Sequence, residues 1–98
     1  MATFLTDRPF SGLKQMKYEQ LLQTDPDWVR EVSKEELEDH LTKLVKRYQQ
    51  RCYQLVDEGM AKALADNPQI SGTAEHFRVG EQVAAQAREI AMRELLEA

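Results

Sequence analysis

One apolar stripe dominates the pattern of hydrophobic and polar positions along this chain. Steps of three and four residues match the 3.6-residue turn of an α-helix, so side chains spaced in this way share one face. The pattern therefore predicts one long helix over residues 34–65. Its stripe consists of Leu37, Leu41, Leu44, Tyr48, Cys52, Leu55 and Gly59.

Capping signals mark both ends of this long helix. Ser33 and Glu36 form a capping box, in which the serine oxygen accepts a hydrogen bond from the Glu36 amide. Pro68 disfavours helical backbone at the residue before it, and Asn67 tolerates a left-handed cap. A straight helix of about 32 residues would be about 48 Å long.

A second helix is predicted over residues 74–95, after a cap within Ser71-Gly72-Thr73. Its apolar face is small at the centre, which lets another helix approach closely. We therefore expect this helix to pack antiparallel against the long one. The apolar face contains Phe77, Gly80, Val83, Ala84, Ala87, Ile90, Ala91 and Leu95, and its small-residue seam is Gly80, Ala84, Ala87 and Ala91.

The N-terminal third is less regular. Residues 1–10 have no period and are interpreted as an arm. Ser11 is a candidate cap for a short helix over residues 12–23, in which Tyr18, Leu21 and Leu22 fall on one side and Leu13 and Met16 nearly opposite. That helix is therefore either packed between two surfaces or only partly formed.

A helical turn over residues 26–31 follows, with Asp25 as cap and Pro26 at its first position. The prediction is a single all-α domain, residues 1–98. Its architecture is an antiparallel helical hairpin of a long central helix and a C-terminal helix, with short N-terminal helices.

Two features of the long helix indicate a further neighbour. A compact chain of this length is about 35 Å across, so the helix would project beyond it. Val56, Met60 and Leu64 also turn the apolar stripe gradually around the helix axis. We expect a homodimeric bundle, and the alternative is a bend at Gly59 with the N-terminal segment folded over the hairpin.

Composition limits the classes of function. The chain has 98 residues, 42% of them hydrophobic and 31% charged, with a net charge of −4. It lacks an apolar run of membrane-spanning length and a secretory signal at its start, so we expect a cytoplasmic protein without a membrane partner. Cys52 is the only cysteine, which excludes an intrachain disulfide. The acidic balance argues against nucleic acid as a general partner but not against a local basic patch.

Little in the sequence points to catalysis. Glu36 and His40 lie one turn apart, but a helical di-metal site would need a second paired set of ligands. Cys52 lies in mid-helix without a histidine one turn away, so we interpret it as a small buried apolar residue. We expect neither an enzyme nor a metal or cofactor site.

Two surfaces remain as candidates for partner binding. Lys43, Lys46, Arg47 and Arg51 form a basic band on the long helix, and Phe4, Phe10 and Trp28 are large apolar groups in the weakly patterned N-terminal third. A solvated charged face and simple packing over the hairpin are the alternatives to a functional role. We predict a non-enzymatic protein–protein interaction module, such as an accessory subunit, adaptor or inhibitor. The alternative is a nucleic-acid-binding regulator that uses the basic band of a dimer.

Overall fold

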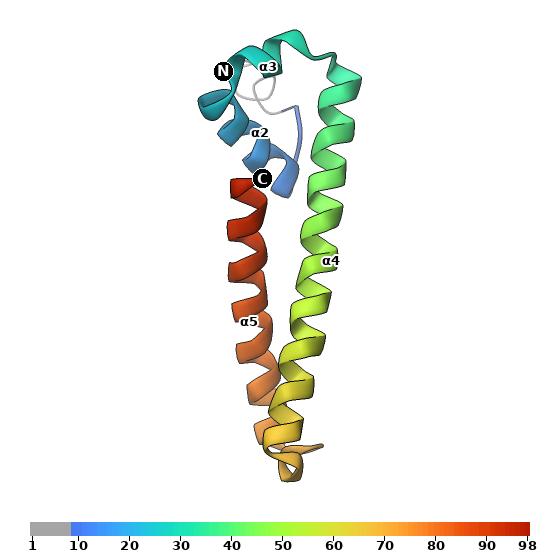
Figure 1. Ribbon diagram of the computed structural model, residues 1–98, viewed down its shortest axis with the longest axis vertical. Coiled ribbons are helices and arrows are strands. Elements are labelled where there is room, and N and C mark those ends of the chain that lie inside the picture. Colours follow the sequence, from blue (N-terminus) through green and yellow to red (C-terminus); the bar gives the residue numbers. More distant parts are fainter. Residues whose placement is uncertain (1–8) are drawn as a thin grey trace. The chain divides into compact units, whose positions relative to one another are not determined.

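The computed structural model describes residues 9–98, which fold into helices without a strand (Figure 1). The α-helices are α2 (Gly12–Thr24), α3 (Pro26–Glu31), α4 (Lys34–Asp66) and α5 (Ala74–Glu97), and a 3-10 turn spans Pro68–Ile70. The all-α fold and the pairing of the long helix with the C-terminal helix are confirmed. The helix bounds lie within two residues of the predicted ranges, while most of the predicted arm lies outside the described residues.

The chain divides into two compact units whose boundary falls within α4. The N-terminal unit comprises residues 1–46 together with Ala98, and the hairpin unit comprises residues 47–97. Each therefore contains part of the long helix. The hairpin unit adds α5 to the second half of α4, and the N-terminal unit adds α2 and α3 to the first half.

The core of the N-terminal unit forms where the stripe of α4 meets α2. Leu21 and Leu37 are buried, and Leu41 is completely inaccessible to solvent. The amide of Glu36 donates to Ser33 Oγ over 3.1 Å, which confirms the predicted serine cap at the start of α4. Aromatic and β-branched side chains complete the cluster, namely Phe10, Tyr18, Trp28, Val29 and Val32.

The buried face of α2 differs from the predicted apolar one. Gln15 and Lys17 are buried, whereas Leu22 is exposed. Lys17 Nζ donates to Gln20 Oε1 over 2.6 Å and to the carbonyl oxygen of Ala98 over 2.8 Å. These bonds compensate for the loss of water, although burial still lowers the pKa of the Lys17 ammonium. Polar side chains thus share the buried face of α2 with Leu21, and among the apolar residues named for this helix only Leu22 is exposed.

The predicted side-chain caps of α2 and α3 are also corrected. Neither Ser11 nor Asp25 caps its helix through its side chain. At the start of α2 the Phe10 amide instead donates to Gln15 Oε1 over 3.2 Å, and Gly12 adopts a φ of 58°. That angle suits glycine, which has no Cβ to clash with the backbone. The chain thus enters α2 by a turn rather than by a serine cap.

Within the hairpin unit, α4 and α5 run antiparallel and approach closely (Figure 1). A Cβ atom on Gly59 would lie 2.6 Å from Val83 Cγ1, which is closer than real Cβ contacts. Ala87 and Ala91 on α5 are almost fully buried. Two of the four seam residues therefore pack inward, as expected for a helix that another backbone approaches, whereas Gly80 and Ala84 are only half-buried.

The connection between the two helices follows its local signals with one exception. Asn67 has a φ of −146° rather than a left-handed conformation, and the positive φ falls instead at Gly72, at 76°. Thr73 Oγ1 accepts from the His76 amide over 3.3 Å, which supplies the expected cap of α5. His76 Nδ1 in turn accepts from the Gly72 amide over 3.0 Å.

The tight seam predicts that Ala87→Leu destabilises the fold. Ala87 is 2% exposed, so the larger side chain would have to displace its neighbours at a cost of about 1–3 kcal/mol. Chemical denaturation would measure the change in the free energy of unfolding. Ala61→Leu is the matched control, because Ala61 is an exposed helical residue near the C-terminal end of α4. Equal stability of both variants would show that Ala87 tolerates the added volume.

Candidate functional site

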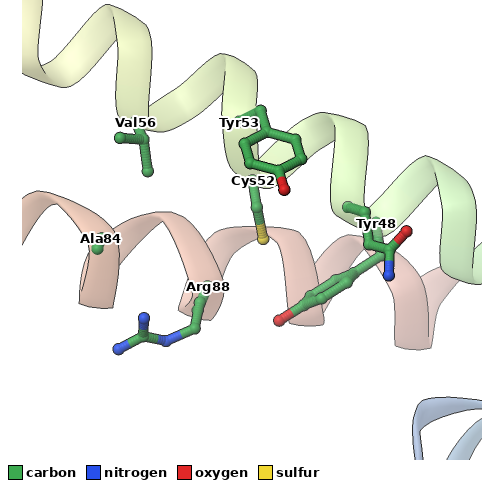
Figure 2. A pocket seen from close by; sticks show the side chains of 7 residues that line it. Tyr48, Cys52, Tyr53, Val56, Ala84 and Arg88 are labelled. Atoms are coloured by element: carbon green, nitrogen blue, oxygen red, sulfur yellow. The ribbon is translucent and has the colours of Figure 1, made fainter.

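Two neighbouring cavities on the hairpin unit are together called here the hairpin groove. One has a volume of about 440 Å³ and the other of about 360 Å³. They are neighbours, because Val56 and Ala84 line both of them. Tyr48, Gln49, Cys52, Tyr53 and Arg88 complete the first cavity (Figure 2), and Met60, His76, Phe77, Gly80 and Glu81 complete the second.

The groove follows from the drift of the apolar stripe along α4. Val56 and Met60 leave the line of the earlier stripe and line a cavity together with Gly80 and Ala84. On α5, Phe77 is 72% exposed and Ile90 is also exposed, so the prediction that both belong to the packed face was wrong. The reason is geometric, because the small seam residues occupy the contact line and larger side chains are left beside it.

Two aromatic side chains stand exposed on the groove. Tyr53 on α4 is 74% exposed, close to the value for Phe77 on α5. Single exposed apolar residues are common, but these two border neighbouring cavities that are mainly apolar. Aromatic residues of this kind contribute much of the binding energy at protein interfaces.

Tyr48 and Cys52 lie side by side in the larger of the two cavities. Figure 2 shows the sulfur of Cys52 directed into the space between α4 and α5, with the ring of Tyr48 beside it. The pKa of Tyr48 is raised by burial first, and then by a hydrogen bond with the Cys52 side chain and by its charge, while Arg88 acts in the opposite direction. Cys52 is half-buried and unbridged, and its environment is that of a packed side chain.

Each of the two cavities has one charged residue on its border. Arg88 borders the cavity near Tyr48, and Glu81 borders the cavity near Phe77. Neither forms an ion pair within the hairpin unit as described. Arg51, in contrast, pairs with Glu94 across the hairpin at 3.0 Å between Nε and Oε1. That pair joins α4 to α5 outside the groove.

The residues of the predicted basic band differ in their surroundings. Lys43 pairs with Asp39 at 2.9 Å, which is the local partner expected from the sequence. Arg51 is occupied by Glu94, a contact that sequence spacing does not reveal. Lys46 and Arg47 are exposed. A partner binding here would compete with two ion pairs.

The predicted aromatic arm has a mainly internal role in its described part. Phe10 packs edge-on against Tyr18, with ring centroids 5.2 Å apart, and Trp28 does so against His40 at 4.9 Å. Both belong to the apolar cluster of the N-terminal unit, and both are half-buried. Phe4 lies outside the described residues. The packing interpretation thus accounts for Phe10 and Trp28 without a partner.

Over residues 9–98 the structure contains no group of three or more histidine, cysteine or acidic side chains placed to hold a metal ion. No helix in the same range is long and apolar enough to cross a membrane. No protein-family model, curated protein or solved structure matches this chain. The hairpin groove is therefore interpreted from its own geometry. Its only advance signal in the sequence was the turning stripe of Val56 and Met60.

The raised pKa of Tyr48 predicts a loss of stability at alkaline pH. An unfolded tyrosine loses its proton near pH 10.0, while the folded Tyr48 retains it, so the free energy of unfolding should fall as pH rises from 10.0 toward the folded pKa. Below pH 10.0 both states are protonated and the effect is absent. Denaturation at several pH values should show a smaller fall for Tyr48→Phe than for the wild type.

Cys52→Ala tests the cause of this shift. The variant removes the hydrogen bond and the charge that raise the pKa of Tyr48, so the ring should ionise at a lower pH than in the wild type. Nuclear magnetic resonance of the tyrosine rings would follow each residue separately, with Tyr48→Phe used for assignment. Identical titration curves would contradict a contribution from Cys52.

Proposed function

We propose that this chain is a non-enzymatic protein–protein interaction module, and that the hairpin groove is its binding surface. The observation that carries the proposal is a pair of neighbouring, mainly apolar cavities bordered by exposed Tyr53 and Phe77. Such a surface gains free energy when another apolar surface covers it. An accessory subunit, an adaptor or an inhibitor would use it in the same way.

The shape of the groove fits an amphipathic helix. From Tyr48 to Met60, α4 borders it over a length of about 18 Å, which corresponds to about three helical turns. Recognition of a helix in a groove uses apolar anchors on one face of the bound helix. Tyr53, Val56 and Met60, spaced by three and four residues, would contact such anchors. Arg88 and Glu81 at the groove would orient the bound helix.

The alternative function predicted from the sequence, nucleic-acid binding by the basic band, has less support. Lys43 and Arg51 are each engaged by a carboxylate, and the net charge of the chain is −4. Phosphate contacts would have to displace those carboxylates. Protein binding through the apolar groove needs no such exchange.

Charged substitutions in the groove test the proposal. Phe77→Glu and Tyr53→Glu each place a carboxylate in the contact while changing an exposed side chain, so stability should change by only about 0.5 kcal/mol. Proteins cross-linked to the tagged wild-type chain in its native cell and quantified by mass spectrometry should be lost from both variants. Leu22→Glu, at an exposed position outside the groove, should retain them. The same proteins recovered with all four chains would contradict the groove as the binding surface.

A further inference from the structure

We propose that the occupant of the hairpin groove is the same groove of a second copy of this chain, packed antiparallel about a two-fold axis. The inference rests on the proposed function of the groove and names its partner. Such an assembly would bring α4 and α5 of two hairpin units together as four helices.

The charges at the groove are arranged for this pairing. Glu81 and Arg88 both border the groove on α5, and the midpoint between them falls at Ala84 and Ala85. A two-fold axis through that midpoint sets Glu81 of each copy opposite Arg88 of the other. Two equivalent ion pairs result, as an interface between identical surfaces requires. Ala84 already marks the junction of the two cavities.

The same axis gives Phe77 a place to bind. Phe77 precedes the midpoint on α5, and Met92 follows it at the same distance along the helix. The two-fold axis therefore sets Phe77 of one copy opposite Met92 of the other. Along the hairpin, the Arg51–Glu94 ion pair and the Gly59–Val83 contact set the register, and they place Met92 level with Cys52 and Tyr53. Phe77 of one copy therefore meets the larger cavity, of about 440 Å³, on the other.

One symmetry operation thus accounts for two independent features. It pairs the two charged residues that border the groove on α5, neither of which has an ion-pair partner among the described residues, and it covers an aromatic side chain that is 72% exposed. The groove contains both members of each complementary pair. Exposed Phe77 matches the cavity of about 440 Å³, and Glu81 matches Arg88. A foreign helix would have to supply all four, whereas a second copy supplies them by identity.

Reciprocal charge reversal tests this pairing. Glu81→Arg alone and Arg88→Glu alone each create like charges at both contacts of a homodimer, so each should weaken self-association at least about tenfold. An equimolar mixture of the two variants restores opposite charges at both contacts and should form a one-to-one heterodimer. Sedimentation equilibrium at micromolar concentration would measure the masses, with the two variants differing by a tag.

Matched controls lie elsewhere on α5. Arg93→Glu and Glu89→Arg make the same charge changes at exposed positions that do not border the groove, and should leave the dimer unchanged. Phe77→Glu and Met60→Glu should dissociate it by placing a charge in the apolar contact, with circular dichroism confirming that both variants fold.

Three results would overturn the inference: a monomeric wild type, a dimer insensitive to both single reversals, or a mixture that forms no heterodimer. A monomeric wild type would leave the proposed function standing if groove variants still lost a cross-linked partner. If the groove variants lost neither self-association nor any cross-linked protein, both the inferred dimer and the proposed function would be contradicted. The two experiments therefore separate the identity of the partner from the use of the groove.

Discussion

The close approach of α4 and α5 is the constraint on which the hairpin unit depends. Gly59 leaves no room for a Cβ atom against Val83, and Ala87 and Ala91 are nearly inaccessible to solvent. A contact line made of small residues brings two helices together over a narrow strip. Larger side chains cannot enter that strip and are left beside it. The hairpin groove is the consequence, because the residues that a wider contact would have buried remain at its border.

The N-terminal unit is held together by buried polar side chains as well as by apolar packing. Its apolar cluster is small, and the inner face of α2 is completed by polar groups that bond to one another or to backbone. Lys17 donates to Gln20 and to Ala98, while Gln15 accepts from the amide of Phe10 and donates to Glu19. Buried polar groups of this kind cost little only when their hydrogen bonds are satisfied, which makes the position of each partner specific. The aromatic residues Phe10 and Trp28 pack onto this unit.

The two units differ in which aromatic and charged side chains stay available to a partner. The N-terminal unit uses its aromatic residues internally, and the ion pairs Lys43–Asp39 and Arg51–Glu94 reduce the charge available on the basic band. The hairpin unit keeps Tyr53 and Phe77 exposed on the hairpin groove. We therefore propose partner binding at the groove rather than at the two surfaces predicted from sequence. Complementary charge at Glu81 and Arg88 would then set the orientation of the partner.

The sequence by itself determined the helices of residues 9–98 and the positions of the small residues on α5, because capping residues and 3.6-residue periodicity act within one turn of backbone. Ser33, Pro68 and Thr73 mark helix ends without help from distant residues. Only the tertiary structure decided which side chains face the partner helix and which stay outside. Phe77 shares the apolar face of α5 yet is exposed, and Lys17 is charged yet buried. Both outcomes depend on the width of a helix contact and on hydrogen-bond partners distant along the chain, neither of which local periodicity encodes.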